Sequence, residues 1–273
     1  VQLGNITVPT PVVLSPMAGV TNWPFRVICE EYGPDGLYVA EMITARALVA
    51  HNPKALRLCH FAKSENPFTA VVRREPLHHR TGGEIVVDGN MADHVDLNFG
   101  CPVPKVTRRG GGSALPWKTD IFTELLQRVV AICEPAGIPV TAKIRVGIDH
   151  NHETFLEAGH IAQEEGCKAV TLHARTAAEY YGGHSDWSRI GELKEHLNIP
   201  VFGNGDIWGA EDALEMVRET GCDGVAIGRG CQGRPWLFAN IKRLRGQSRT
   251  AQPESGRGLP RDSPSCRAAY RVL

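Results

Sequence analysis

The chain has 273 residues, of which 42% are hydrophobic, and its 30 basic and 30 acidic residues give a formal net charge of +0. No apolar run approaches the roughly 18 residues of a membrane helix, and the first residues lack the basic and apolar regions of a signal peptide. The balanced charge gives no global support to a nucleic-acid partner. The eight cysteines show no C-x-x-C spacing, which argues against zinc and a disulfide framework and favours a reducing cytoplasm.

Short apolar segments alternate with amphipathic segments along the chain. The apolar segments predict strands at 12–14, 37–40, 94–97, 140–144, 169–173, 201–203 and 224–227. Apolar residues recur with helical spacing over 121–133, 152–165 and 210–220. Gly137, Gly166 and Gly221 follow these three segments, as helix stops should. The alternation predicts a parallel sheet with helical crossovers.

The number of repeats indicates the architecture. An eighth strand is expected between Phe61 and Asn90, and eight βα units in about 245 residues match a (β/α)8 TIM barrel. A doubly wound open sheet is the alternative, although no G-x-G-x-x-G opens its first helix. We expect the barrel over 1–245 and an irregular, disordered or frame-shifted tail over 246–273, which is rich in Gly, Pro, Ser and Arg.

Polar and glycine-rich residues follow the predicted strands. In a barrel these positions meet at the carboxyl-terminal face, where active sites lie. The segments are 15–19, 41–42, 98–101, 143 with 145, 173 with 175, 204–206 and 228–230. The last two follow the seventh and eighth strands and predict a phosphate site, because glycines let backbone N–H groups approach an anion. The alternative is that each glycine only makes a tight turn.

Three side chains in these segments suggest chemistry. Cys101 lies on a loop between Gly100 and Pro102, where its thiol can donate a proton or attack as a thiolate. Lys143 lies within an apolar strand, so it either faces a reduced flavin or extends to water. His173 ends its strand and is either a structural hydrogen-bonding group or part of the site.

The segment after Cys101 is basic and rich in glycine. It contains Lys105, Arg108, Arg109 and Lys118, which taken alone read as a solvated surface run. Residues 110–113 read Gly-Gly-Gly-Ser and predict a mobile part of an active-site loop, or else a flexible linker.

These segments together resemble the bacterial tRNA-dihydrouridine synthases, and most of all the B-type or NifR3-like branch. The resemblance covers residues 8–245. It rests on segments that occur in the family's order: 15–22, 96–104 with 109–112, 142–145, 172–176, 203–207 and 227–233.

The resemblance implies an FMN-bound barrel that reduces the C5=C6 bond of uridine in tRNA, with NADPH or NADH as reductant. Hydride then passes from flavin N5 to uridine C6, and Cys101, the catalytic residue, donates a proton to C5. The implied cofactor-binding residues are Pro16, Met17, Ala18, Lys143, His173, Asn204, Gly205, Asp206, Gly228 and Arg229. The implied substrate-binding residues are Asn98, Lys105, Arg109 and Arg175. We expect a cytoplasmic monomer that acts on tRNA without a metal or a membrane.

Two stretches depart from the family pattern. The family's third strand carries a Gln-Leu-Tyr-Gly type of run, whereas residues 68–84 lack glutamine and include Pro76. We therefore hypothesise an out-of-frame translation there that disrupts the third strand and impairs the protein. Translating the gene in its other frames tests this hypothesis. Family members also continue into a helical domain that grips tRNA, which we expect to be largely missing, truncated or frame-shifted after Arg245.

Two other functions fit the same residues. One is an FMN barrel reductase that acts on a small pyrimidine-like ene substrate. The other is an inactive barrel that binds RNA or regulates, although nothing in the chain resembles a helix-turn-helix or a basic DNA-reading helix.

Overall fold

The structure of the chain is a computed structural model, which describes residues 1–61, 65, 68–73, 82–108 and 110–246. Its strands are β1 (Gln2–Leu3), β2 (Ile6–Thr7), β3 (Val12–Leu14), β4 (Leu37–Thr44), β5 (Phe68–Arg73), β6 (His94–Asn98), β7 (Val140–Arg145), β8 (Val170–His173), β9 (Val201–Asn204) and β10 (Gly224–Ile227). Its α-helices are α1 (Trp23–Tyr32), α2 (Ala45–Val49), α3 (Pro53–Leu58), α4 (Gly82–Asp88), α5 (Pro104–Thr107), α6 (Thr119–Cys133), α7 (Phe155–Glu164), α8 (Ser188–His196), α9 (Ala210–Thr220) and α10 (Leu237–Leu244). Three short 3-10 helices are η1 (Gly112–Ala114), η2 (Glu134–Ala136) and η3 (Arg229–Cys231).

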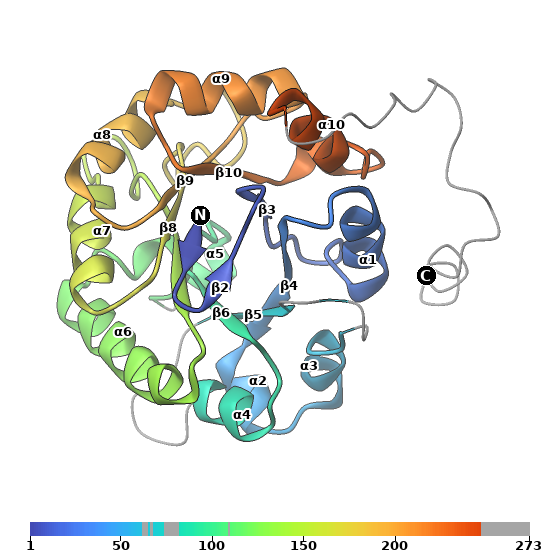
Figure 1. Cartoon of the computed structure of the whole chain (residues 1–273). Helices are drawn as coiled ribbons and strands as arrows, with labels where there is room; N and C mark the ends of the chain where they lie inside the picture. The colour runs from blue at the N-terminus through green and yellow to red at the C-terminus, as the bar shows by residue number, and fades with distance from the viewer. Residues whose placement is uncertain (62–64, 66–67, 74–81, 109, 247–273) are drawn as a thin grey trace.

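Strands β3 to β10 form a closed barrel of eight parallel strands within the described residues. β10 closes it by pairing with both β9 and β3, and the helices form a ring outside (Figure 1). The predicted (β/α)8 barrel is therefore confirmed. Each strand segment expected from the sequence forms a strand, and α9 spans the predicted 210–220. None of the helices in the described ranges has the length and apolar character that a bilayer crossing requires.

The third barrel strand, β5, forms where the sequence pattern departs from the family. Its backbone pairs in parallel with β4 on one side and β6 on the other, with Val39 opposite Thr69 and Leu97 opposite Val72. The expected disruption is therefore absent at residues 68–73. Residues 74–81, the centre of the suspected frame shift, and the tail 247–273 lie outside the described residues, so those two expectations stay predictions.

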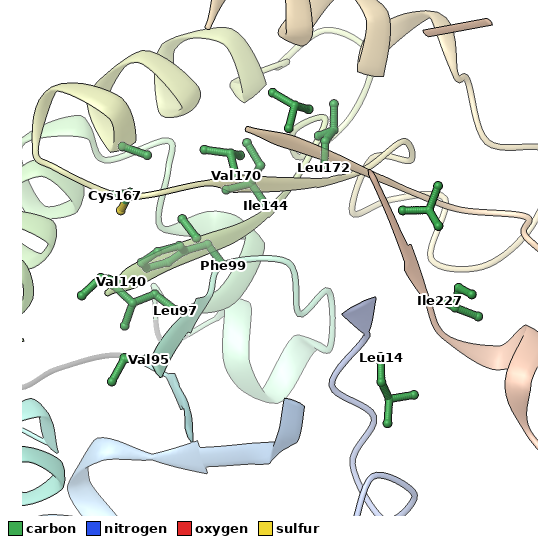
Figure 2. Close-up of a cluster of buried hydrophobic side chains, with 14 of the residues drawn as sticks. Leu14, Val95, Leu97, Phe99, Val140, Ile144, Cys167, Val170, Leu172 and Ile227 are labelled. Carbon is green, nitrogen blue, oxygen red and sulfur yellow. The ribbon is translucent and has the colours of Figure 1, made fainter. Parts of the chain in front are cut away.

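The main hydrophobic core lies between the barrel and its helices. Val95, Leu97 and Phe99 point outward from β6, as period-two alternation requires, and pack in a cluster with the outward side chains of β7 and β8 (Figure 2). The Phe99 ring meets Phe122 of α6 edge to face, with centroids 4.8 Å apart. Burying a side chain of this size stabilises the fold by about 1.5–3 kcal/mol. Most of the buried apolar side chains therefore pack between the strands and the surrounding helices, outside the lumen.

The lumen contains a second, smaller apolar cluster. It consists of Leu3, Val8, Val13, Leu37, Val39, Ala169, Phe202 and Ala226. Leu3 and Val8 belong to the N-terminal hairpin, which lies across one opening of the barrel (Figure 1). Since the hairpin packs on Val13 and Leu37 near the strands' amino ends, it closes that end and leaves the carboxyl ends as the accessible face.

Candidate active site

A pocket of about 340 Å³ lies at the carboxyl ends of the barrel strands. This volume falls within the usual range of small-molecule and cofactor sites. Among the residues predicted from the sequence, the pocket is lined by Pro16, Met17, Ala18, Asn98, Cys101, Lys143, His173, Arg175, Asn204, Gly205, Asp206, Gly228 and Arg229. Lys105 is exposed on α5 and does not line it, and Arg109 lies outside the described residues. The strand ends thus converge as barrel geometry requires.

Cys101 is held in the pocket wall by the glycine-rich loop that follows it. The Ser113 backbone N–H and hydroxyl both donate to the Cys101 carbonyl, at 3.1 and 3.2 Å. Gly112, with φ +57°, lies so close that an added Cβ would stand 2.4 Å from the same carbonyl oxygen. Arg145 Nε donates to the Gly100 carbonyl at 2.9 Å. The backbone at Cys101 is therefore held on both sides, and residues 112–114 form η1.

Lys143 is a buried lysine whose side chain points into the barrel. Its Nζ donates to Asn204 Oδ1 at 3.1 Å, and Asn204 Nδ2 donates in turn to the Ala226 carbonyl at 2.6 Å. Burial lowers the pKa of Lys143 to about 7, with a further lowering by Arg145 and an opposing effect of Asp96. This lysine can therefore change its charge near neutral pH.

His173 is surrounded by positive charge. Burial lowers the pKa of His173 well below its ordinary value, and neighbouring cations lower it further. These cations are Lys143, Arg145, Arg175 and Arg229. The imidazole is therefore neutral at physiological pH, and the surrounding potential favours an anionic ligand.

Two aromatic rings flank the arginines at the rim of the pocket. The Arg229 guanidinium carbon lies 4.9 Å from the centroid of Tyr181 and 5.3 Å from that of Trp208. The Arg145 guanidinium carbon also lies near the Tyr181 ring, 5.4 Å from its centroid. Sequence reasoning missed Tyr181 and Trp208. The available signals were an aromatic beside Gly182 and a second aromatic shortly after the segment 204–206, but many such residues have no role.

Arg175 lines the pocket, but its guanidinium donates hydrogen bonds to other groups of the protein. Its Nη2 donates to both carboxylate oxygens of Asp206 at 2.8 Å and to the Gly183 carbonyl at 2.9 Å. Its Nη1 and Nε donate to Ser185 Oγ and the Gly182 carbonyl, each at 2.9 Å. Arg175 thereby joins the loop after β8 to the turn after β9. Its expected contact with substrate stays a prediction.

Ser15 carries an unusual polar group. Its side chain is 5% exposed, and its Oγ is one of two buried side-chain polar atoms without a hydrogen-bond partner among the described residues. Ser15 lines the pocket directly after β3. A buried hydroxyl without a partner costs about 1–3 kcal/mol, so a ligand that bonds it gains that energy.

The pocket holds no candidate metal site. Within the described residues, no group of three or more His, Cys, Asp or Glu side chains is arranged to hold an ion. The ionisable side chains among the described residues that line the pocket are those of Cys101, Lys143, Arg145, His173, Arg175, Tyr181, Asp206 and Arg229.

The structure is thus a (β/α)8 barrel with a cation-lined pocket at the carboxyl ends of its strands. A family model described as "Dihydrouridine synthase (Dus)" matches residues 13–257, and the chain belongs to that family. The match begins in β3 and runs through every barrel strand to beyond α10.

Curated relatives carry related names. A protein of Mycobacterium tuberculosis named "Probable tRNA-dihydrouridine synthase" is 50% identical over 248 residues, covering 88% of this chain and 64% of the relative. A "tRNA-dihydrouridine synthase B" of Pseudomonas syringae pv. tomato is 37% identical over 243 residues, covering 89% of this chain and 71% of the relative. The chain thus spans slightly under two thirds of the length of its mycobacterial relative.

Solved structures show the same fold at much lower identity. The 6-hydroxypseudooxynicotine amine oxidase (HisD) of Pseudomonas geniculata N1 superposes with a TM-score of 0.61 at 15% identity, covering 90% of this chain and 49% of that chain. FabK of Thermotoga maritima superposes with a TM-score of 0.54 at 14% identity, covering 82% of this chain and 59% of that chain. These matches support the barrel fold alone.

Proposed function

We propose that this protein reduces the C5=C6 bond of uridine in tRNA to dihydrouridine, with FMN as cofactor and NADPH or NADH as reductant. The observation that carries the proposal is that Cys101, Lys143, His173 and Arg229 line one pocket. These residues come from four separate strand ends, yet the fold brings a thiol and a set of cations to the same cavity. Family membership supports the same activity.

The residues of the pocket fit a flavin mononucleotide. The phosphate would lie against the glycine turns and Arg229, because N–H groups and a guanidinium both favour an anion. The ring would lie between Lys143, His173 and the turn 16–18. Ser15 Oγ, which is buried and has no hydrogen-bond partner among the described residues, offers that ring a hydrogen bond. When bound, FMN supplies the hydride that an ene bond requires.

The protein's own groups supply the proton and the orientation. Cys101 holds a proton at Sγ within the pocket wall and, in this proposal, delivers it to uracil C5. Asn98 lines the same wall two positions past Asp96 on β6 and is the proposed uracil contact. Arg145 orients the loop by its bond to the Gly100 carbonyl.

A flavin spectrum followed by a turnover assay tests the proposal. We expect the purified chain to take up FMN, with absorbance bands of bound flavin that NADPH bleaches under anaerobic conditions. Unmodified tRNA should then restore the oxidised spectrum and yield dihydrouridine, while free uracil should not. Protein that binds no FMN, or bound FMN whose reduced form is not reoxidised by tRNA, would contradict the proposal.

A further inference from the structure

One wall of the barrel lumen is polar along its whole length, beneath the pocket. The inward positions of β6 are His94, Asp96 and Asn98, and those of β7 include Thr141 and Lys143. The register places Asp96 opposite Thr141 and Asn98 opposite Lys143. All five side chains are buried. The apolar cluster around Phe202 lies in the same lumen, so a buried charge of the polar column must find its partners among the polar groups around it.

The hydrogen bonds of this column have a fixed direction. Thr141 Oγ1 lies 2.7 Å from Asp96 Oδ1 and 2.9 Å from His94 Nε2. Since an ionised carboxylate only accepts, the Thr141 hydroxyl donates to Asp96 and accepts from His94. Burial lowers the pKa of His94 to about 3, so its ring is neutral. Because Thr141 accepts from this ring, the proton of the neutral ring lies on Nε2. His94 therefore contributes a dipole and no charge, and within the hydrogen-bonded series His94–Thr141–Asp96 the charge lies on Asp96.

Asp96 is the carboxylate available to Lys143. A cavity of about 20 Å³ lies between them and the apolar wall, lined by Ser15, Asp96, Thr141 and Lys143 among others. One buried water needs about 10–15 Å³ and several polar partners, so this cavity has room for one. Of the described acidic residues that line this cavity or the larger pocket, the other is Asp206, which is engaged by Arg175.

We propose that Asp96 is a positioning residue whose buried carboxylate keeps the Lys143 ammonium charged inside the barrel. The groups that face Lys143 are Asp96 and Asn98 from β6, Arg145 from its own strand, His173 from β8, Asn204 from β9 and Ser15 from the end of β3. In this set Asp96 carries the negative charge and raises the pKa of Lys143, whereas the positive charge of Arg145 lowers it. His173 is neutral. Without Asp96, the buried ammonium would keep its hydrogen bond to Asn204 and have neutral polar groups around it, but no negative charge within this set.

The charge on Asp96 affects the pKa of Lys143, and the charge on Lys143 affects the pKa of Asp96. Burial raises the pKa of Asp96 to about 6, while the Thr141 hydrogen bond and Lys143 oppose the rise. Both groups are therefore charged between about pH 6 and 7. Their mutual attraction offsets part of the free energy that it costs to remove the two charges from water. Its importance for catalysis rests on the proposed function, because Lys143 would then present its charge to the flavin. The pairing itself does not depend on that function.

The test measures the titration of Lys143 in the cofactor-free protein. The Nζ resonance of 15N-labelled lysine, assigned by its loss in Lys143→Arg, should titrate near pH 7 in the native protein. Asp96→Asn should lower this midpoint by about one pH unit or more, since an opposite charge nearby raises a lysine pKa by that amount. Asp120→Asn, an exposed carboxylate on α6, is the matched control and should leave the midpoint unchanged.

An unchanged or higher midpoint in Asp96→Asn would overturn the proposal. If that variant does not fold, Thr141→Val serves instead, because it removes the donor to Asp96 and keeps the carboxylate. We expect a smaller shift in the same direction from Thr141→Val, and no shift would again overturn the proposal. The measurement needs neither FMN nor tRNA, so a protein that proves inactive leaves it intact.

Discussion

At the scale of single residues, Cys101 differs from the other thiols in its access to the pocket. Of the seven cysteines in the described residues, it is the one that lines the pocket. If it acts as the proton donor, Cys101→Ala should lower dihydrouridine formation by about 10²–10⁴-fold, the usual contribution of a general acid. FMN affinity and the anaerobic reduction of FMN by NADPH should stay unchanged. Stopped-flow absorbance and nucleoside analysis separate these two steps.

A matched variant controls for the loss of a buried thiol. Cys133→Ala removes a cysteine from α6, on the helix side of the barrel, and should leave product formation intact. Loss of FMN reduction and product formation together in Cys101→Ala would reject the proton-donor role and point to a role in holding the flavin.

Arg175 is expected to act through the loop that it holds. Its guanidinium is 1% exposed and bonds Asp206, Ser185 and two carbonyls. Arg175→Met should lower the free energy of unfolding by about 3–5 kcal/mol, because removing one partner leaves Asp206 without its counter-charge. Urea unfolding measures this. Arg189→Met is the control, since its ion pairs are more exposed and worth about 1 kcal/mol or less.

The sequence could predict those pocket-lining residues that lie on a strand or just after one. Cys101, Lys143 and His173 were found because a strand of alternating residues fixes which side chains reach the carboxyl face. Tyr181 could not be found this way, since its place depends on an irregular loop held by Arg175. The pairing of Asp96 with Thr141 was equally hidden, because it depends on the register between β6 and β7.

At the scale of elements, β5 shows where pattern reading fails. Its expected disruption came from a lost family motif, yet the backbone ladders on both sides are made by β4 and β6. A closed barrel has room for one strand between β4 and β6, and the unpaired backbone groups of these two strands favour an extended segment there. Pairing with both neighbours therefore does not require the family's sequence motif. The other strands were predictable since each combines β-branched residues with a glycine or polar stop.

The segment between β6 and α6 is expected to contact tRNA phosphates. Residues 99–118 contain four basic residues and no acidic residue, and Lys105, Arg108 and Lys118 are exposed. Replacing these three with glutamine should weaken tRNA binding and reduce the slope of log affinity against log salt by about two to three, as each phosphate contact contributes close to one. Filter binding or fluorescence anisotropy over a salt series measures the slope.

A cation at the other end of the barrel provides the control for this segment. Lys168 precedes β8 and pairs with Glu134, so Lys168→Gln should leave the salt slope unchanged. An equal loss of slope in both variants would show diffuse attraction without a defined contact surface on the carboxyl face.

At the scale of the whole molecule, burial of ionisable groups sets the stability at alkaline pH. Among the described cysteines, burial raises the pKa of Cys59 to about 11 and that of Cys167 to about 12, and raises those of Cys29 and Cys222 as well. Unfolded thiols ionise near pH 8.5. Above that pH the unfolded state loses protons that the native state keeps, so these groups lower the stability as pH rises.

Lys143 has the opposite effect, but the thiols outnumber it. Burial lowers its pKa to about 7, so the unfolded state holds one proton more than the native state until about pH 10.4. Counting Cys29, Cys59 and Cys167, the native state still keeps a net one to two protons, which predicts a loss of about 2–3 kcal/mol per pH unit between about pH 9 and 10. Urea midpoints at pH 7.5 and 9.5 under reducing conditions measure this loss, and Cys167→Ala should make it shallower by about one proton. A midpoint that is constant or rises over this range would show that the native thiols ionise too, and that the core admits water around them.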